Sequence, residues 1–222
     1  MGKLIVFEGT DGSGKSTQFQ LLTEKMQKNQ MDFQRLVFPQ YSEPSSSLIR
    51  MYLNGEFGTN PADVNAYAAS CFYAVDRFAS YQKVWKPYYE AGGLVLADRY
   101  TTSNAVHQGA KVPEAERDAF FSWLYEFEFQ KMGLPKPDLV LFLDVPIEIT
   151  EQMMRRRERA TNTSADIHEQ DLDYLRCCRK TGLEAAAFYG WTVVNCAEAD
   201  GMRPIAQIHE EIYEYVKVCL ED

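Results

Sequence analysis

The residues best suited to chemistry form a glycine-rich run near the N-terminus. Residues 9–16 read Gly-Thr-Asp-Gly-Ser-Gly-Lys-Ser, which fits the phosphate-loop pattern G-x-x-x-x-G-K-[S/T] at every position. Glycines let the backbone wrap closely around phosphate oxygens, and the helix N-terminus that follows attracts anions. The Lys15 ammonium can reach the β- and γ-phosphates of a nucleotide, and the Ser16 hydroxyl can ligate Mg²⁺. The run therefore predicts nucleotide binding.

A second set of candidate groups is cationic. Arg77 follows Tyr73 by four residues, so the two share a helix face, Arg99 directly follows an apolar run, and residues 155–159 read Arg-Arg-Arg-Glu-Arg. Guanidinium groups suit phosphoryl transfer, which depends on neutralising two polyanions and aligning them. The alternatives are ordinary. Arg99 could form a surface ion pair, Arg77 could snorkel from a core helix, and the arginine run could be a solvated helix end.

Short apolar runs alternate with stretches of helical period, and these elements must position the candidate groups. The apolar runs that we expect to be strands are residues 4–7, 36–38, 94–97, 139–143 and 191–196. Helices are expected after the phosphate loop, over about 63–81 and 114–131, and on both sides of the last strand. Strongly apolar strands separated by helices are typical of a parallel sheet covered on both faces. We therefore expect a doubly wound, five-stranded α/β fold that binds ligands at the carboxyl ends of its strands.

Composition narrows the class of protein. The chain has 222 residues, of which 45% are hydrophobic and 25% charged, with a formal net charge of −9. That charge argues against a non-specific nucleic-acid or membrane-surface binder. No stretch approaches the roughly 20 apolar residues of a membrane span. The five cysteines lack metal-ligand spacing and are interpreted as reduced thiols, so we expect a single soluble domain over residues 1–222, located in the cytoplasm.

Several motifs, taken in order, resemble those of thymidylate kinases over nearly the whole chain. They are Phe7-Glu8-Gly9 before the phosphate loop, Phe38-Pro39-Gln40-Tyr41, Tyr73 to Arg77, Asp98-Arg99-Tyr100, and Pro137-Asp138 with Asp144-Val145-Pro146. The Asp-Arg-Tyr tripeptide is the most discriminating, because related deoxynucleoside kinases tend to have Glu-Arg-Ser there. The Asn-Lys-x-Asp of a GTP-reading switch does not occur in the sequence.

The resemblance implies a P-loop NTPase fold with a short lid and the reaction MgATP + dTMP → ADP + dTDP. It also implies a homodimer. ATP and dTMP are the expected partners, with neither nucleic acid nor membrane among them. Two alternatives stay open: a kinase for another deoxynucleoside monophosphate such as dUMP or dCMP, and a phosphate-loop module that binds nucleotide without turnover.

On the donor side, the resemblance assigns phosphate, metal and lid residues. The implied catalytic residues are Lys15, Arg99, Arg155 and Arg159. The implied ATP-binding residues are Gly9, Thr10, Asp11, Gly12, Ser13, Gly14, Lys15, Ser16, Thr17 and Arg156. The implied Mg²⁺ site consists of Ser16, Asp98 and Asp11.

The family places a catalytic arginine either in the phosphate loop or in the lid. Gly12 stands at the loop position here, so we expect the lid, about residues 155–168, to supply it, without a choice among its arginines. Asp166, His168 and Glu169 resemble the motif that follows the lid. Asp166 and Glu169 also form a helix-capping box.

On the acceptor side, the resemblance assigns the residues around thymidylate. They are Asp11, Phe38, Pro39, Tyr41, Tyr73, Arg77, Arg99, Asn104, His107 and Gln108. Tyr73 would stack on the pyrimidine, and Arg77 would contact the base or the phosphate. Either Asn104 or Gln108 would read the thymine edge, since both amides present a donor and an acceptor.

Two positions depart from the family's usual residues. His107 stands where relatives have Tyr or Phe crowding the sugar 2′ position, so we hypothesise that ribose is excluded less strictly. The alternative is a satisfied surface histidine. Tyr41 stands where many relatives have Arg, and a neutral phenol there shifts more of the phosphate grip to Arg77 and Arg99.

Overall fold

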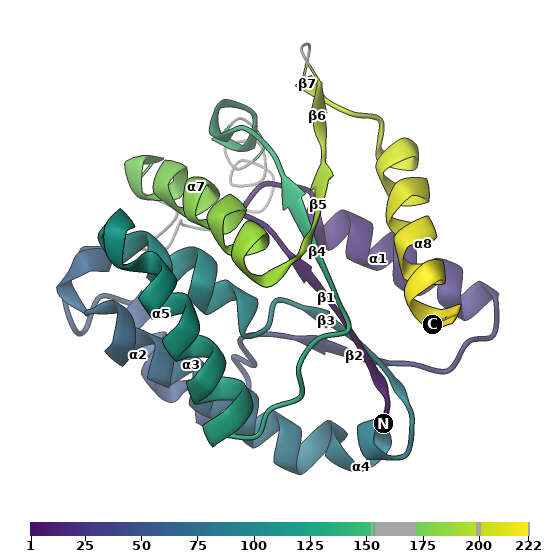
Figure 1. Ribbon diagram of the computed structural model, residues 1–222, viewed down its shortest axis with the longest axis horizontal. Coiled ribbons are helices and arrows are strands. Elements are labelled where there is room, and N and C mark those ends of the chain that lie inside the picture. Colours follow the sequence, from purple (N-terminus) through teal and green to yellow (C-terminus); the bar gives the residue numbers. More distant parts are fainter. Residues whose placement is uncertain (152, 154–171, 199–200, 222) are drawn as a thin grey trace.

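A computed structural model describes residues 1–151, 153, 172–198 and 201–221 of the chain. Its central sheet has five parallel strands in the order β2-β3-β1-β4-β5 (Figure 1). The strands are β1 (Lys3–Glu8), β2 (Gln34–Val37), β3 (Leu94–Asp98), β4 (Leu139–Asp144) and β5 (Thr192–Asn195). The predicted doubly wound α/β fold is confirmed, and each expected strand is present with slightly different ends.

Helices cover both faces of this sheet (Figure 1). α1 (Lys15–Lys28) and α8 (Ile205–Glu221) lie on one face. The opposite side carries α2 (Ser47–Leu53), α3 (Ala66–Ser80), α4 (Lys86–Glu90), α5 (Arg117–Leu124) and α7 (Leu172–Tyr189). The described residues also form three π-helical segments: η3 (Tyr81–Trp85) between α3 and α4, η4 (Asn104–Gln108) after β3, and η7 (Tyr125–Lys131) after α5.

Alternate residues of β1 enter two different cores. Ile5 and Phe7 pack in the cluster that includes Phe19 of α1, whereas Leu4 and Val6 pack with Trp85 of η3. All four β1 residues are fully buried. Because side chains alternate across a strand, a central strand covered on both faces is apolar along its whole length. That pattern fixes β1 in the middle of the sheet and its carboxyl end at the phosphate loop.

Some elements differ from the sequence-based expectation. The helix expected over 114–131 is divided among η6 (Glu114–Glu116), α5 and η7, and α2 was not predicted. The stretch after the fifth strand contains the short antiparallel strands β6 (Ala197–Glu198) and β7 (Gly201–Met202). His209 of α8 is buried, and desolvation, together with the nearby Lys25 charge, lowers its pKa. In the described part of the chain, no helix is long and apolar enough to cross a membrane.

Candidate active site

The phosphate loop connects β1 to α1 at the carboxyl edge of the sheet. Gly12 and Gly14 adopt left-handed backbone conformations, with φ of 79° and 83°, which residues with side chains rarely adopt. A cavity of about 170 Å³ is lined by all predicted ATP-binding residues from Thr10 to Thr17, together with Met153. A Cβ atom on Gly9 would lie 2.9 Å from the Leu143 carbonyl oxygen, so only glycine fits there. The sequence motif has therefore folded into a compact cradle.

A second cavity of about 180 Å³ lies beside the first. All ten residues predicted on the acceptor side line it, and Leu53, Asp76, Tyr100 and Ser103 complete its wall. They come from the phosphate loop, α2, α3, η4 and the segments after β2 and β3. Asp11 belongs to the lining of both cavities. The two cavities thus meet at the Asp11 carboxylate.

Arg99 occupies this junction. Its Nη2 atom lies 2.7 Å from Asp11 Oδ1, and its Nη1 atom lies 3.3 Å from Glu8 Oε1 and 2.9 Å from His107 Nε2. Its backbone has φ of 65°, an unusual left-handed value for a residue other than glycine, and its N–H donates to the Phe7 carbonyl. Burial disfavours the charge, but the Asp11 and Glu8 carboxylates outweigh it and raise the pKa of Arg99. The guanidinium is therefore a fixed cation.

The Glu8 carboxylate holds the Arg99 guanidinium in position. Its side chain is fully buried at the end of β1. Oε1 accepts from the Gly9 N–H, and Oε2 accepts from the hydroxyls of Thr102 (2.7 Å) and Ser103 (2.5 Å). Buried carboxylates are stable only when paired and hydrogen-bonded, and Glu8 meets both conditions. It links the phosphate loop to the segment that carries Arg99.

Arg77 is held by a partner that lies 51 residues away in the sequence. Its Nε and Nη2 atoms donate to the two oxygens of Glu128 in η7, both at 2.7 Å, and Nη1 donates to the Tyr100 carbonyl. Asn104 Nδ2 donates to the same Glu128 carboxylate at 2.9 Å and to the Ser70 carbonyl. Glu128 balances the charge of Arg77 and fixes its guanidinium at the wall of the acceptor cavity.

A family model and several known proteins resemble this chain over most of its length. The family model described as thymidylate kinase matches residues 7–212. The chain belongs to the thymidylate kinase family. A thymidylate kinase of Mycobacterium tuberculosis is 30% identical over 190 residues, covering 85% of this chain and 87% of that relative. One of Afipia carboxidovorans is 32% identical over 215 residues, covering 96% and 88%. The resemblance found in the sequence is confirmed.

A solved structure shows the same fold. It is a thymidylate kinase from Candida albicans, 24% identical, with a TM-score of 0.72, and the match covers 98% of this chain and 92% of that chain. The thymidylate kinase fold thus extends over nearly the whole of this protein.

Some family positions expected from the sequence lie outside the described residues. They are the lid and post-lid residues Arg155, Arg156, Arg159, Asp166, His168 and Glu169. The other predicted site residues fall in one of the two cavities, apart from Gly9 and Asp98, which adjoin them. Asp98 ends β3 and lies 3.6 Å from the Lys15 ammonium.

Sequence reasoning gave no role to Glu8 or Glu128 in this thymidylate kinase family member. Each carries a signal that could have been used, because an acid at the end of an apolar strand, or within the aromatic run Tyr125–Phe129, is costly to bury without a specific partner. For reading the base, the sequence does not distinguish the Asn104 amide from that of Gln108. Its Oε1 atom is buried and accepts no hydrogen bond among the described residues.

Proposed function

We propose that this protein transfers the γ-phosphate of ATP to dTMP, giving ADP and dTDP. The observation that carries the proposal is the junction of the two cavities, where Asp11 belongs to both linings and Arg99 lies 2.7 Å from it. A donor in the phosphate loop and an acceptor in the second cavity would meet at this guanidinium. In-line phosphoryl transfer needs such an arrangement of two polyanions around fixed cations.

The donor phosphates would lie in the phosphate loop. Backbone N–H groups at the start of α1 and the Lys15 ammonium would bind the β- and γ-phosphate oxygens. Lys15 is almost fully buried and is kept close to the loop by Asp98. A buried, oriented ammonium neutralises charge more effectively than one in water.

The residues at the donor site also fit Mg²⁺. Asp98 Oδ1 is buried and accepts no hydrogen bond among the described residues, so an ion or its bound water would satisfy it. Ser16 and Asp98 would hold the ion, whereas Asp11 is engaged by Arg99 and is better suited to positioning it. When bound, Mg²⁺ neutralises charge on the β- and γ-phosphates.

The acceptor does not require a general base. The second phosphate pKa of a nucleoside monophosphate is about 6, so its oxygen is already an anion at neutral pH. Arg99 would hold this phosphate and stabilise the charge that develops between donor and acceptor. Asp11 and Glu8 keep the guanidinium in position, which limits the reorganisation needed during the reaction.

The base would be read deeper in the acceptor cavity. Tyr73 would stack on the pyrimidine, and the Gln108 Oε1 atom would accept from the thymine N3–H. Cytosine presents an acceptor at N3, so it would leave Gln108 Oε1 unsatisfied, a penalty of about 1–3 kcal/mol. His107 would lie near the sugar, because its Nε2 atom contacts Arg99.

A coupled assay of ADP release with dTMP, dUMP, dCMP and dGMP tests the proposal. We expect the highest kcat/KM with dTMP and a loss of about a thousandfold in kcat for Arg99→Ala. Arg176→Ala, which removes an exposed cation from α7 outside both linings, is the matched control. Absence of dTMP-dependent ADP release would favour the non-catalytic module, and a preference for dUMP or dCMP would favour the alternative kinase.

The lid assignment is tested separately. We propose that Arg155, Arg156 or Arg159 closes on the transferred phosphate. Each arginine is replaced by alanine in turn, with Arg176→Ala on α7 as the control for an exposed arginine. A loss of about a hundredfold in kcat in one lid variant alone would identify the catalytic arginine. Equal, small losses in all of them would reject the assignment.

We also propose that residues 1–222 form one nucleoside monophosphate kinase domain that acts as a homodimer in the cytoplasm. α3 exposes Tyr67, Val75 and Phe78, which a second copy would cover. Light scattering of Val75→Glu, against Val218→Glu on α8 as a control, tests the dimer. Only Val75→Glu should give a monomer. All five cysteines are free, as expected of a reducing compartment.

A further inference from the structure

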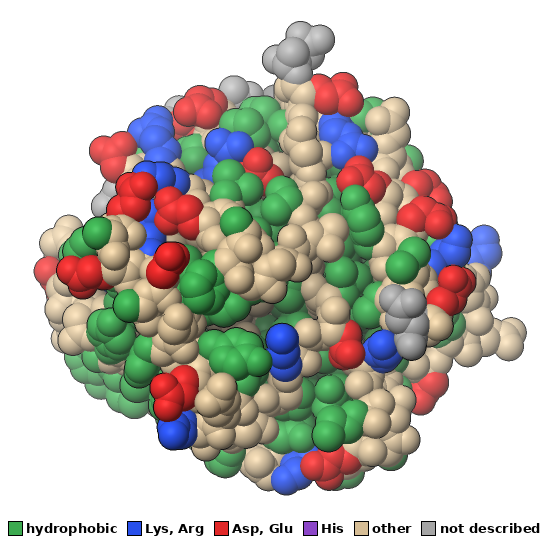
Figure 2. All heavy atoms as spheres, in the orientation of Figure 1, with side chains coloured by type: hydrophobic (Ala, Val, Ile, Leu, Met, Phe, Trp, Pro, Cys, Tyr) green, Lys and Arg blue, Asp and Glu red, His purple; other side chains and the backbone are tan. Residues whose placement is uncertain are grey.

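A cavity of about 540 Å³ lies apart from both nucleotide cavities and shares no lining residue with them. It opens to the surface and is lined by α5, η7, the end of α7, Val140 of β4 and residues 101–105, 136–138 and 190–191. Figure 2 shows this face of the molecule hollowed where hydrophobic side chains gather beside a basic one. Its volume falls within the roughly 300–1,000 Å³ typical of small-molecule sites. Phosphoryl transfer makes no use of it.

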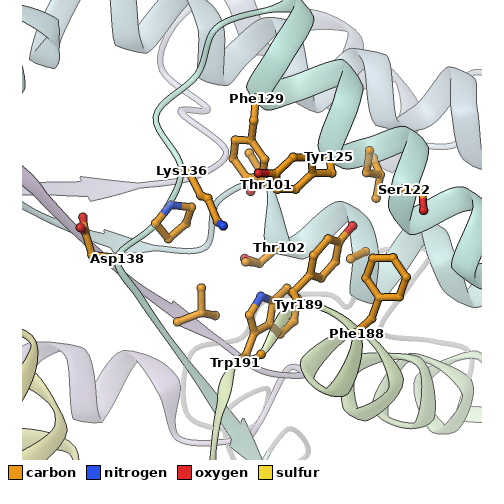
Figure 3. A pocket seen from close by; sticks show the side chains of 15 residues that line it. Thr101, Thr102, Ser122, Tyr125, Phe129, Lys136, Asp138, Phe188, Tyr189 and Trp191 are labelled. Atoms are coloured by element: carbon orange, nitrogen blue, oxygen red, sulfur yellow. The ribbon is translucent and has the colours of Figure 1, made fainter.

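The walls of this cavity are aromatic on two sides. Tyr125 and Phe129 project from η7, and Tyr189 and Trp191 project from the opposite side (Figure 3). The Tyr189 and Trp191 rings are stacked, with centroids 5.5 Å apart and planes at 14°. The Tyr125 and Phe129 rings meet edge to face at 5.3 Å. Opposed aromatic walls favour a flat ring system, which can stack on one wall and meet the other edge-on.

The cavity lining holds one basic and one acidic side chain, Lys136 and Asp138. The Lys136 ammonium points toward its centre, whereas the Asp138 carboxylate points away (Figure 3). Asp138 is already engaged, because it accepts from the Leu4 N–H at 2.8 Å and lies 3.9 Å from the Lys3 ammonium. Lys136 Nζ lies 5.5 Å from the centre of the Tyr125 ring, so the cation stands beside the aromatic wall. An anionic substituent on a flat ring would meet this ammonium.

We propose that this cavity binds a flat aromatic molecule that carries one anionic group, with the rings between the two aromatic walls and the anion at Lys136. The site is separate from those for ATP and dTMP. Because it depends on none of the nucleotide-binding residues, the proposal holds independently of the proposed reaction.

Fluorescence titration with two matched probes tests this site. Anilinonaphthalene sulfonate carries the rings and an anion, and phenylnaphthylamine has the same rings without the sulfonate. We expect one site for each probe on the full chain. Lys136→Gln should weaken sulfonate binding about fivefold, the value of a partly exposed ion pair, and leave phenylnaphthylamine binding unchanged. Lys131→Gln, an exposed lysine of η7 that does not line the cavity, is the control and should change neither.

A second variant tests the location of the rings. Ser122 lies at the exposed rim of the cavity, and Ser122→Trp should block it, weakening both probes about tenfold or more. Saturating ATP and dTMP should displace neither probe. The proposal is overturned if Lys136→Gln leaves sulfonate binding unchanged, or if dTMP or ATP displaces the sulfonate. Since Lys136 is exposed, its variant reports on binding even where Ser122→Trp fails to fold.

Discussion

Arg77 and Glu128 form a bidentate pair in which both N···O contacts are 2.7 Å and both side chains are buried. Removal of one partner from such a pair typically costs about 3–5 kcal/mol, because it leaves an uncompensated buried charge. Replacement of both partners by apolar residues is often nearly neutral. The pair therefore offers a means of separating the contribution of Arg77 to folding from its contribution to the site.

We predict that Glu128→Leu lowers the free energy of unfolding by about 3–5 kcal/mol, and that adding Arg77→Met restores most of it. The double variant should still have a raised KM for dTMP, because Arg77 lines the acceptor cavity. Urea unfolding and steady-state kinetics measure the two effects. Glu114→Leu, which breaks an exposed pair with Lys180, is the control and should leave the free energy of unfolding nearly unchanged. A double variant as unstable as Glu128→Leu would contradict the prediction.

Gln108→Met should change stability and binding in opposite directions. An unsatisfied buried carbonyl costs about 1–3 kcal/mol, so removing the Gln108 amide should leave the free energy of unfolding unchanged or raise it. The KM for dTMP should rise about tenfold as a thymine contact is lost. Asn104→Leu is the comparison, and it should lower stability as well, because the Asn104 amide donates to Glu128. An unchanged KM in Gln108→Met would shift the base-reading role to Asn104.

Glu8→Gln should impair turnover more than substrate binding. The neutral amide would remove the negative charge that pairs with Arg99, and its N–H₂ group would require the Thr102 and Ser103 hydroxyls to accept instead of donate, which would loosen Arg99. We expect kcat to fall about a hundredfold, with stability reduced by about 1–3 kcal/mol. Rapid-mixing measurements of a single turnover check the chemical step. Glu56→Gln, at an exposed position, is the control. Wild-type kcat in Glu8→Gln would show that Glu8 has no part in positioning Arg99.

Lys111 should make stability rise with pH in alkaline solution. Burial lowers the pKa of Lys111 from 10.5 to about 8, so between these values the unfolded chain binds more protons than the folded one. The charged form is penalised most below pH 8, and the penalty disappears as pH approaches 10.5. Lys111→Met removes this term, so its stability relative to wild type should fall across that window by about 2 kcal/mol.

Urea unfolding at several pH values measures the Lys111 effect. Lys83→Met is the control, because the Lys83 side chain is 67% exposed, and its difference from wild type should not depend on pH. A constant difference for Lys111→Met as well would mean that the folded protein keeps Lys111 charged throughout.

Features determined by short stretches of sequence were predictable. β1 and the phosphate loop are contiguous, and a buried parallel strand is apolar along its length, so residues 4–16 identify both. The strand that ends at Asp98 likewise indicated that Arg99 would lie at the carboxyl edge of the sheet.

Features that depend on distant partners were not predictable. No local pattern connects Arg77 to Glu128, and the widened π-helical turns that hold Asn104 and Glu128 have no periodic signature. Asp11 both lines the phosphate-loop cavity and pairs with Arg99, and only the fold shows that one side chain does both.

The Thr102 hydroxyl both lines the aromatic cavity and donates to Glu8. A compound bound in the cavity would therefore contact a side chain that also holds Glu8, without competing with either nucleotide. Inhibitors of this protein need not imitate a nucleotide or compete with cellular ATP. Screening for ligands of this aromatic cavity would find molecules that a search based on substrate analogues would miss.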